Sequence, residues 1–158
     1  MDSLAYTIWH SPIGALTLCE SQRGLVSLAF GERPPKGATR NDRAAAECRR
    51  QLQEYFAGRR REFTVPLDLQ GTDFQLRCWQ ALLKIPYGET RTYAQQARTV
   101  KCPQGFRAVG MANHDNPVAI VVPCHRVVAS NGGLGGYGGG LDLKRRLLLL
   151  ESGQGALV

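Results

Sequence analysis

Hydrophobic and polar residues alternate in two short stretches near the start of the chain. Leu16 and Leu18 belong to the first stretch, and Val26 and Leu28 belong to the second. Alternation with a period of two places every second side chain on the same face, which is typical of β-strands. The turn signals SPIG and SQRG separate the stretches, so residues 4–30 are predicted to form a small antiparallel sheet.

Helical spacing replaces this alternation after the stretch GERPPKGATRND, whose prolines and glycines favour a loop. In the following segment, RAAAECRRQLQEYFAG, the side chains of Leu52, Tyr55 and Phe56 fall on one face, and Gly58 is a helix stop signal. We therefore predict a helix that packs on the sheet.

The chain becomes mainly helical after residue 70, which indicates an N-terminal α/β domain (1–70) and a C-terminal domain (71–158). A capping box of Thr72 and Gln75 predicts the start of the first C-terminal helix. The apolar stripe of that helix is predicted to contain Leu76, Trp79, Leu82 and Leu83.

Two short helices are predicted next, joined by a tight turn. Thr92 and Gln95 form a second capping box that opens YAQQART, and Pro103 is predicted to be the first residue of a helix in PQGFRAVGMAN. Such a pair is a helix-turn-helix candidate, although many helical hairpins bind nothing. The second helix offers polar and small side chains that suit a groove: Arg107, Ala108, Gly110, Ala112 and Asn113.

The last predicted helix begins at Asp142 and ends at Gly153. It is expected to bury Leu143, Leu147 and Leu150 and to expose residues 144–146. Glu151 follows Leu147 by four positions and therefore lies on the buried stripe. An inward carboxylate needs a partner, and His125 is one candidate.

The glycine-rich segment NGGLGGYGGGL contains the pattern G-x-G-x-x-G at Gly133, Gly135 and Gly138. A dinucleotide site requires a helix and a second strand after this pattern, and the chain ends too soon for both. We therefore expect a mobile loop that carries Tyr137.

Composition narrows the classes of partner. The net charge of +7 favours a polyanionic partner such as nucleic acid, with ordinary solubilising residues as the alternative. No apolar run reaches the roughly 20 residues of a membrane span, and the first 20 residues lack the pattern of a secretory signal. These features predict a cytoplasmic protein without a membrane partner.

The five cysteines show no C-x-x-C spacing, which argues against a disulfide framework and against a zinc site. Cys124 and His125 are adjacent in NPVAIVVPCHRVV, where they offer a nucleophile and a base. The alternative is a small buried thiol beside a core histidine. Because adjacent side chains in extended chain point to opposite faces, the two groups are expected to communicate through a water or a bend after Pro123.

The motif PCHRV, with RAVG and NP upstream and GYGGG downstream, resembles the active-site signature of the O6-alkylguanine-DNA alkyltransferases. The resemblance covers residues 71–153, and SPIGALTL and YFAGRRREFTVPLDL extend it more loosely into the N-terminal half. It implies an α+β fold, with a ribonuclease H-like N-terminal domain and a helix-turn-helix in the C-terminal domain. It also implies DNA repair by single-use transfer of an alkyl group from O6-alkylguanine, and from O4-alkylthymine, to a cysteine.

The family uses no cofactor and flips the damaged base out of double-stranded DNA, which it binds through the minor groove. The resemblance further implies a monomer that can assemble cooperatively on DNA.

By motif position, Cys124 is the nucleophile, His125 the water-linked base and Glu151 the carboxylate that orients His125. Asn116 holds the turn before the active site, and Tyr93 lies beside the flipped nucleotide. The resemblance implies a substrate pocket formed by Tyr137, Gly138 and Val127. It implies DNA contacts from Thr92, Arg107, Ala108, Gly110, Ala112 and Asn113, with Arg107 as the finger that fills the vacated stack.

One residue departs from the family pattern. Better-known eukaryotic members have a serine after the loop tyrosine, where this chain has Gly138. Two other classes are weighed against the transferase. Alkyltransferase-like proteins bind damaged DNA but lack the reactive cysteine that Cys124 provides, and a cysteine hydrolase built on the same residues would turn over repeatedly.

Overall fold

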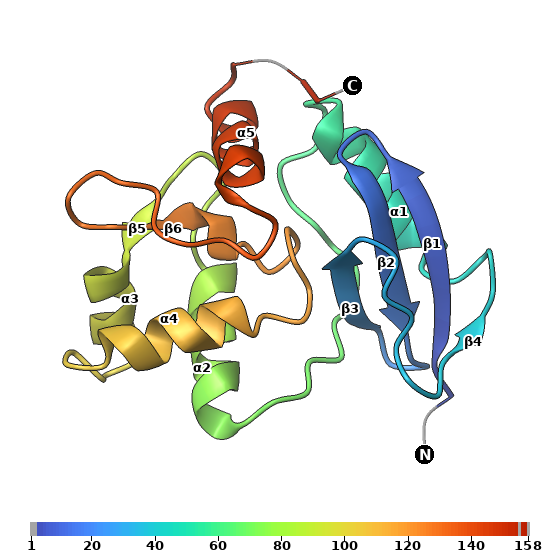
Figure 1. Ribbon diagram of the computed structural model, residues 1–158, viewed down its shortest axis with the longest axis horizontal. Coiled ribbons are helices and arrows are strands. Elements are labelled where there is room, and N and C mark those ends of the chain that lie inside the picture. Colours follow the sequence, from blue (N-terminus) through green and yellow to red (C-terminus); the bar gives the residue numbers. More distant parts are fainter. Residues whose placement is uncertain (1–2, 155, 158) are drawn as a thin grey trace. The chain divides into compact units, whose positions relative to one another are not determined.

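The computed structural model describes residues 3–154 and 156–157 and separates into two compact units (Figure 1). The first contains the residues up to Gln70 together with Pro117–Ala119, and the second contains Gly71–Asn116 and Ile120–Gln154. Strands dominate the first unit and helices dominate the second, so the predicted α+β fold class is confirmed.

The sheet of the first unit has the strand order β3-β2-β1-β4. Antiparallel pairing joins the first three strands, as the alternation predicted. Their bounds are β1 Ala5–Ser11, β2 Gly14–Glu20 and β3 Leu25–Phe30. A two-residue strand, β4 (Thr39–Arg40), pairs parallel to β1 and makes the sheet mixed. It was not predicted, because it lies in a loop-like stretch without alternation.

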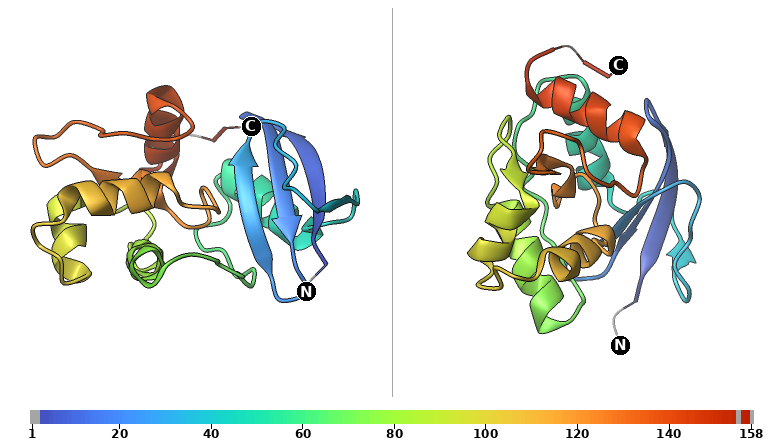
Figure 2. Two further views of the ribbon diagram at one scale, coloured as in Figure 1. Left: turned by 60° about the horizontal axis from the view of Figure 1, so that its bottom comes forward. Right: turned by 60° about the vertical axis from the view of Figure 1, so that its left-hand side comes forward.

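Helix α1 (Ala46–Phe56) packs on one face of this sheet (Figure 2). Leu52, Tyr55 and Phe56 are fully buried, and the ring of Phe56 stacks on Trp9 of β1 with a centroid distance of 6.2 Å. The prediction that this face of the helix meets the sheet is therefore confirmed.

The second unit contains four helices within the described residues. Both predicted capping boxes, at Thr72 and Thr92, are present with both of their hydrogen bonds. A short parallel pair of strands, β5 (Arg91–Thr92) and β6 (Val127–Val128), lies between the helical segments. The helices are α2 Asp73–Leu83, α3 Tyr93–Thr99, α4 Phe106–His114 and α5 Leu141–Glu151.

Two predicted details of these helices are wrong. Leu83, expected on the buried stripe of α2, is 37% exposed because the helix ends there, and Ile85 fills the core just beyond that end. Pro103 is not the first residue of α4. A turn in which the Gly105 N–H donates to the Cys102 carbonyl delays the start of the helix to Phe106.

Among the described residues, no helix is both long enough and apolar enough to cross a membrane. All five cysteines are free thiols, and Cys19, Cys48 and Cys78 are buried.

Candidate active site

The predicted nucleophile Cys124 begins a single 3-10 turn, η1 (Cys124–Arg126), which follows a buried segment. The Asn116 side chain donates a hydrogen bond of 2.7 Å to the Val122 carbonyl and closes the loop between α4 and this turn. Ile120 in the same loop is buried and has a φ of 71°, a conformation that β-branched residues rarely adopt. The backbone before Cys124 is therefore held in one defined and strained path.

His125 is completely buried and points to α5 instead of toward the pocket. Its Nε2 lies 2.7 Å from Oε2 of Glu151, so the spacing argument that placed Glu151 inward identified its partner correctly. An ionised carboxylate can only accept, so Nε2 must carry the proton and Nδ1 must carry the lone pair. No described residue hydrogen-bonds Nδ1, which is buried and available to accept a proton.

Arg126 completes this network, although sequence reasoning assigned it no role. Its Nε and Nη2 donate to both oxygens of Glu151 at 2.7 and 3.1 Å, and its Nη1 donates to the Ile85 carbonyl at 2.7 Å. Both side chains are almost entirely buried. A two-pronged contact of this kind fixes the orientation of a carboxylate more firmly than one hydrogen bond does.

The electrostatics of the network favour an ionised Glu151 and a neutral His125. Burial raises the pKa of the Glu151 carboxyl, but hydrogen bonds and charge from His125 and Arg126 outweigh burial and lower that pKa to about 2. Burial lowers the pKa of His125 below its ordinary value of 6.5 despite the opposing effect of Glu151, and the charges of Arg126 and Lys144 lower it further. A neutral imidazole supported by a carboxylate is suited to act as a base.

The Cys124 thiol stays protonated in this environment. Burial raises the pKa of the thiol above 9.0, while a hydrogen bond with Asn116 and the charge of Lys144 partly oppose that increase. No hydrogen bond joins Cys124 directly to His125, which agrees with the expectation that adjacent side chains point apart. A nearby base is therefore needed to generate the nucleophilic thiolate.

Lys144 contradicts the predicted exposure of residues 144–146. Its side chain is fully buried, and its Nζ donates to the carbonyls of Val127 and Gly136 at 2.6 and 3.1 Å. Burial lowers the pKa of Lys144 from 10.5 to about 8, and the negative charge that Cys124 carries when ionised opposes this decrease. The ammonium group therefore connects β6 to the glycine-rich loop and places a positive charge near the thiol. Leu143, expected to be buried, is only half-buried, because the helix turns Lys144 inward.

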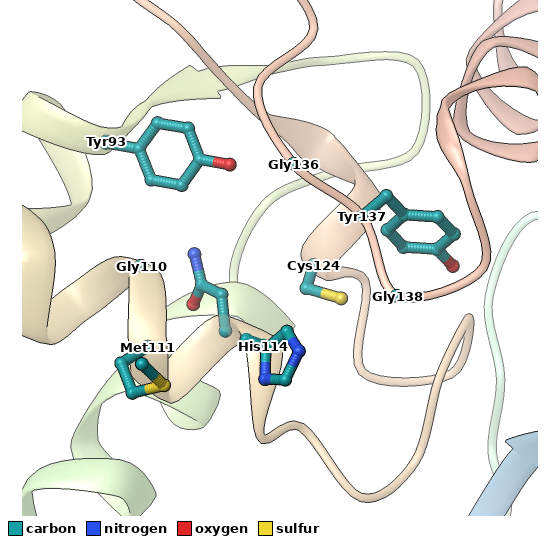
Figure 3. Close-up of a pocket in the computed structure, with 9 residues that line it drawn as sticks. Tyr93, Gly110, Met111, His114, Cys124, Gly136, Tyr137 and Gly138 are labelled. Carbon is teal, nitrogen blue, oxygen red and sulfur yellow. The ribbon is translucent and has the colours of Figure 1, made fainter.

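A pocket of about 480 Å³ opens beside Cys124 (Figure 3). Its walls come from α3, α4, η1 and the glycine-rich loop, and the sulfur of Cys124 points toward the loop that carries Tyr137 and Gly138 (Figure 3). The lining residues are Tyr93, Gly110, Met111, Asn113, His114, Cys124, Gly136, Tyr137 and Gly138. The predicted pocket residue Val127 is fully buried outside this lining, and the carbonyl of its backbone binds Lys144.

The loop requires glycine at one position for steric reasons and leaves another position open. Gly135 has a φ of 74°, and an added Cβ would lie 2.7 Å from the Tyr93 hydroxyl oxygen. At Gly138, by contrast, a Cβ would meet nothing within 4 Å, so the missing side chain is not explained by crowding. The hydroxyl of Tyr137 is buried. Burial raises its pKa well above 10.0, and the negative charges of an ionised Cys124 and of Glu151 raise that pKa further.

The predicted DNA-facing residues of α4 divide into two groups. Arg107 and Ala108 are exposed, and Gly110 lines the pocket. Ala112 and Asn113 are buried and do not present an open surface, although Asn113 also lines the pocket, and their contact with DNA stays a prediction. The Asn113 amide forms two hydrogen bonds, of 2.9 and 2.8 Å, with Gln96 and thereby holds α4 against α3.

Thr92, which is also a predicted DNA contact, has the capping role that its spacing from Gln95 predicted. Its hydroxyl accepts a hydrogen bond from the Gln95 backbone and caps α3, directly before Tyr93. The described residues contain no group of His, Cys, Asp and Glu side chains that could hold a metal ion.

Comparisons with known proteins agree with this arrangement. The model of the 6-O-methylguanine DNA methyltransferase, DNA binding domain, matches residues 73–153, and that of the ribonuclease-like domain matches residues 4–69. A methylated-DNA–protein-cysteine methyltransferase of Mycolicibacterium paratuberculosis is 50% identical over 152 residues, which cover 94% of this chain and 92% of the relative. One of Methanosarcina acetivorans is 47% identical over 92% of this chain and 97% of its own.

A solved structure of Mycobacterium tuberculosis OGT in complex with DNA has a TM-score of 0.92 to this chain. The two sequences are 48% identical, and the match covers 96% of this chain and 95% of the other.

Proposed function

The chain belongs to the 6-O-methylguanine DNA methyltransferase family, and from this premise we propose that Cys124 is the residue that takes the alkyl group from O6-alkylguanine in DNA. The observation that carries the assignment is the thiol in the wall of a pocket beside a buried His125, Glu151 and Arg126 network. The protein acts by direct reversal of damage, as a methyltransferase that binds DNA.

The proposed transfer uses only groups of the chain and the damaged base. The Cys124 proton passes to Nδ1 of His125 through a water, and the thiolate attacks the alkyl carbon on O6. The sulfur–carbon bond forms as the carbon–oxygen bond breaks, and the electron pair of the broken bond remains with the guanine, which takes up a proton. A thioether has no activated bond that water can cleave, so each chain acts once.

Intact mass spectrometry tests this proposal directly. Mixing the protein with excess duplex that contains O6-methylguanine is expected to raise the mass by one methyl group per chain. Peptide mapping is expected to place the group on Cys124, with none on Cys48 or Cys102. Continued conversion of substrate by protein of unchanged mass would identify a turnover enzyme and reject single-use transfer.

DNA binding is proposed to use α3 and α4 as a helix-turn-helix, with α4 against the minor groove. The exposed Arg107 lies on the side of α4 that meets the pocket, since Gly110 and His114 follow it at helical spacing. We propose that its guanidinium fills the stack after the base leaves. O4-alkylthymine as a second substrate, cooperative binding by monomers and a cytoplasmic location, whose reducing conditions keep thiols free, remain predictions.

Replacement of Arg107 separates base flipping from chemistry. Arg107→Ala is expected to slow repair of duplex DNA by about ten- to a hundredfold, because unstacking the base costs a few kcal/mol. Its reaction with free O6-benzylguanine should stay within about twofold of wild type, since a free base needs no replacement in a stack. Parallel single-turnover assays measure both rates. Equal losses on the two substrates would show that Arg107 supports the fold and does not replace the base.

A further inference from the structure

Two large apolar side chains lie exposed on α4, next to the pocket. Phe106 is 49% exposed and Met111 is 60% exposed, whereas Val109 and Ala112 of the same helix are buried. The helix is therefore already anchored by its inward face, and the ring of Phe106 contributes little to the core. A half-exposed aromatic ring on the helix that lines the pocket indicates a surface that a partner covers on binding.

The position of Phe106 relative to the pocket follows from helical geometry. Phe106 and Gly110 are one turn apart on the same side of α4, and Gly110, Met111 and His114 line the pocket that contains Cys124. A duplex that delivers a base to Cys124 must therefore lie along this side. At about 1.5 Å of rise per residue, Phe106 precedes Gly110 by roughly 6 Å. For a helix that runs along the groove, that distance corresponds to about two base steps of roughly 3.4 Å on the DNA.

A hydrogen-bonded turn leads directly into the first turn of α4, which carries this ring. The Gly105 N–H donates to the Cys102 carbonyl at 2.8 Å, and a Cβ on Gly105 would lie only 2.5 Å from the Cys102 sulfur. A larger residue at position 105 would therefore have to displace the Cys102 side chain. The neighbouring side chain, Arg107, is an exposed cation that can contact a phosphate or a base stack. An apolar residue and a basic residue therefore lie side by side at the start of α4.

We propose that Phe106 is an apolar wedge that enters the minor groove of double-stranded DNA and partly unstacks a base step about two steps from the flipped nucleotide. The inference rests on the proposed function, because it requires that DNA present a base to the Cys124 pocket. Minor-groove proteins insert apolar side chains in this manner and bend the duplex. Arg107 replaces the extruded base, while the ring of Phe106 opens a stack about two steps away and is itself covered by the DNA.

With such a wedge, the rate of repair should depend on the sequence that flanks the lesion, although Phe106 makes no hydrogen bond that distinguishes one base from another. Pyrimidine–purine steps unstack more readily than others. Lesions with such a step at the position that Phe106 reaches should therefore be repaired faster than lesions flanked by stiff steps, and the difference should vanish when the ring is removed.

The test compares Phe106→Ala with Leu149→Ala, a control that removes an apolar side chain that is 41% exposed on α5. Phe106→Ala is expected to lose about tenfold in the single-turnover rate on O6-methylguanine duplex, because stacking on an aromatic ring commonly contributes that much. It should also lose the fluorescence increase of a 2-aminopurine placed two steps from the lesion. Phe106→Trp should retain both signals, and Leu149→Ala should match wild type.

Three results would overturn the wedge. Unchanged duplex rate and fluorescence in Phe106→Ala would show that the ring does not enter the DNA. An equal loss on free O6-benzylguanine would assign Phe106 to the pocket or to the fold. A loss in Phe106→Ala that Phe106→Trp does not restore would point to shape at that position and not to stacking. Failure of the proposed function is distinguishable, because wild-type protein would then take no methyl group from any substrate.

Discussion

Cys124→Ser is expected to abolish alkyl transfer while leaving affinity for DNA unchanged. A serine hydroxyl is far less acidic than a thiol and a much weaker nucleophile toward saturated carbon, so the rate should fall by more than about a thousandfold. The DNA-binding groups proposed on α4 are separate from η1, and phosphate contacts contribute most of the affinity. Single-turnover assays with O6-methylguanine duplex and binding titrations at fixed salt concentration measure the two effects.

A matched control is Cys102→Ser, which alters the other cysteine that is not fully buried. Cys102 precedes α4 and does not line the pocket, so this variant should transfer at the wild-type rate. Residual transfer by Cys124→Ser at more than about a tenth of the wild-type rate would mean that another thiol accepts the alkyl group, and Cys124 would lose its assignment.

The inward position of Glu151 was predicted for a local reason, whereas the roles of Cys124 and His125 came from the family resemblance. Glu151 was placed inward by its spacing from Leu147, and an inward acid needs a partner, which the structure shows to be His125. The capping boxes at Thr72 and Thr92 likewise depend only on residues three positions apart. The capping boxes and the inward position of Glu151 can be recognised in a sequence because the residues that define them lie within about one helical turn of each other. The pairing of Glu151 with His125, which is 26 positions away, depends on the tertiary fold.

Of the two buried cations, Lys144 precedes Leu147 by three positions and lies on the same helical stripe as Glu151, so the spacing that placed Glu151 inward also applies to Lys144. Arg126 could not be found in this way. Charged side chains are exposed by default, and no periodicity marks a residue in a single 3-10 turn. The partners of Arg126 are the Ile85 carbonyl and Glu151, which are 41 and 25 positions away. Their convergence depends on the tertiary fold. An inward cation can be suspected only after the inward carboxylate is known to need more than one donor.

Asn113 is another polar residue that was expected on the surface, in this case the surface of α4 that contacts DNA, and that is buried in the structure. Its amide can satisfy both donor and acceptor groups only because Gln96 faces it from α3. A reciprocal pair of amides has no signature in the sequence, since the two residues are 17 positions apart. The packing of α3 on α4 therefore buries a residue to which the resemblance had assigned a DNA contact.

Replacement of Arg126 is expected to cause the largest loss of stability among these variants. Arg126→Met leaves the buried Glu151 without its two-pronged partner, and removal of one member of a buried ion pair commonly costs about 3 to 5 kcal/mol. For a domain of this size the melting temperature should fall by roughly 10 °C. Arg145→Met, which removes an exposed cation from α5, should melt within about 2 °C of wild type. Thermal scans at neutral pH measure both.

The same substitution should change the acid limit of stability. In the wild type the pKa of Glu151 is about 2 in the folded state against an ordinary value of 4.5, so its ionisation stabilises the fold above pH 4.5. That contribution is lost as the pH falls from 4.5 toward 2. Without Arg126 the folded-state pKa of Glu151 rises, so the contribution above pH 4.5 is smaller. Acid titrations followed by circular dichroism should therefore show a weaker acid dependence from this group in Arg126→Met.

The pH dependence of transfer distinguishes a positioning role for Arg126 from a purely structural one. Loss of its charge raises the pKa of His125, because Arg126 opposes protonation of the imidazole and Glu151 favours it. His125 must be neutral to accept the Cys124 proton, so the acid limb of the rate profile should move to higher pH in Arg126→Met. Arg126→Lys keeps the charge and should restore the limb, although the loss of the two-pronged contact should leave part of the stability defect. Free O6-benzylguanine is the substrate of choice, because its reaction omits DNA binding. If both variants lose stability but keep the wild-type pH profile, Arg126 serves the fold alone and the base at His125 is tuned by Glu151 and burial.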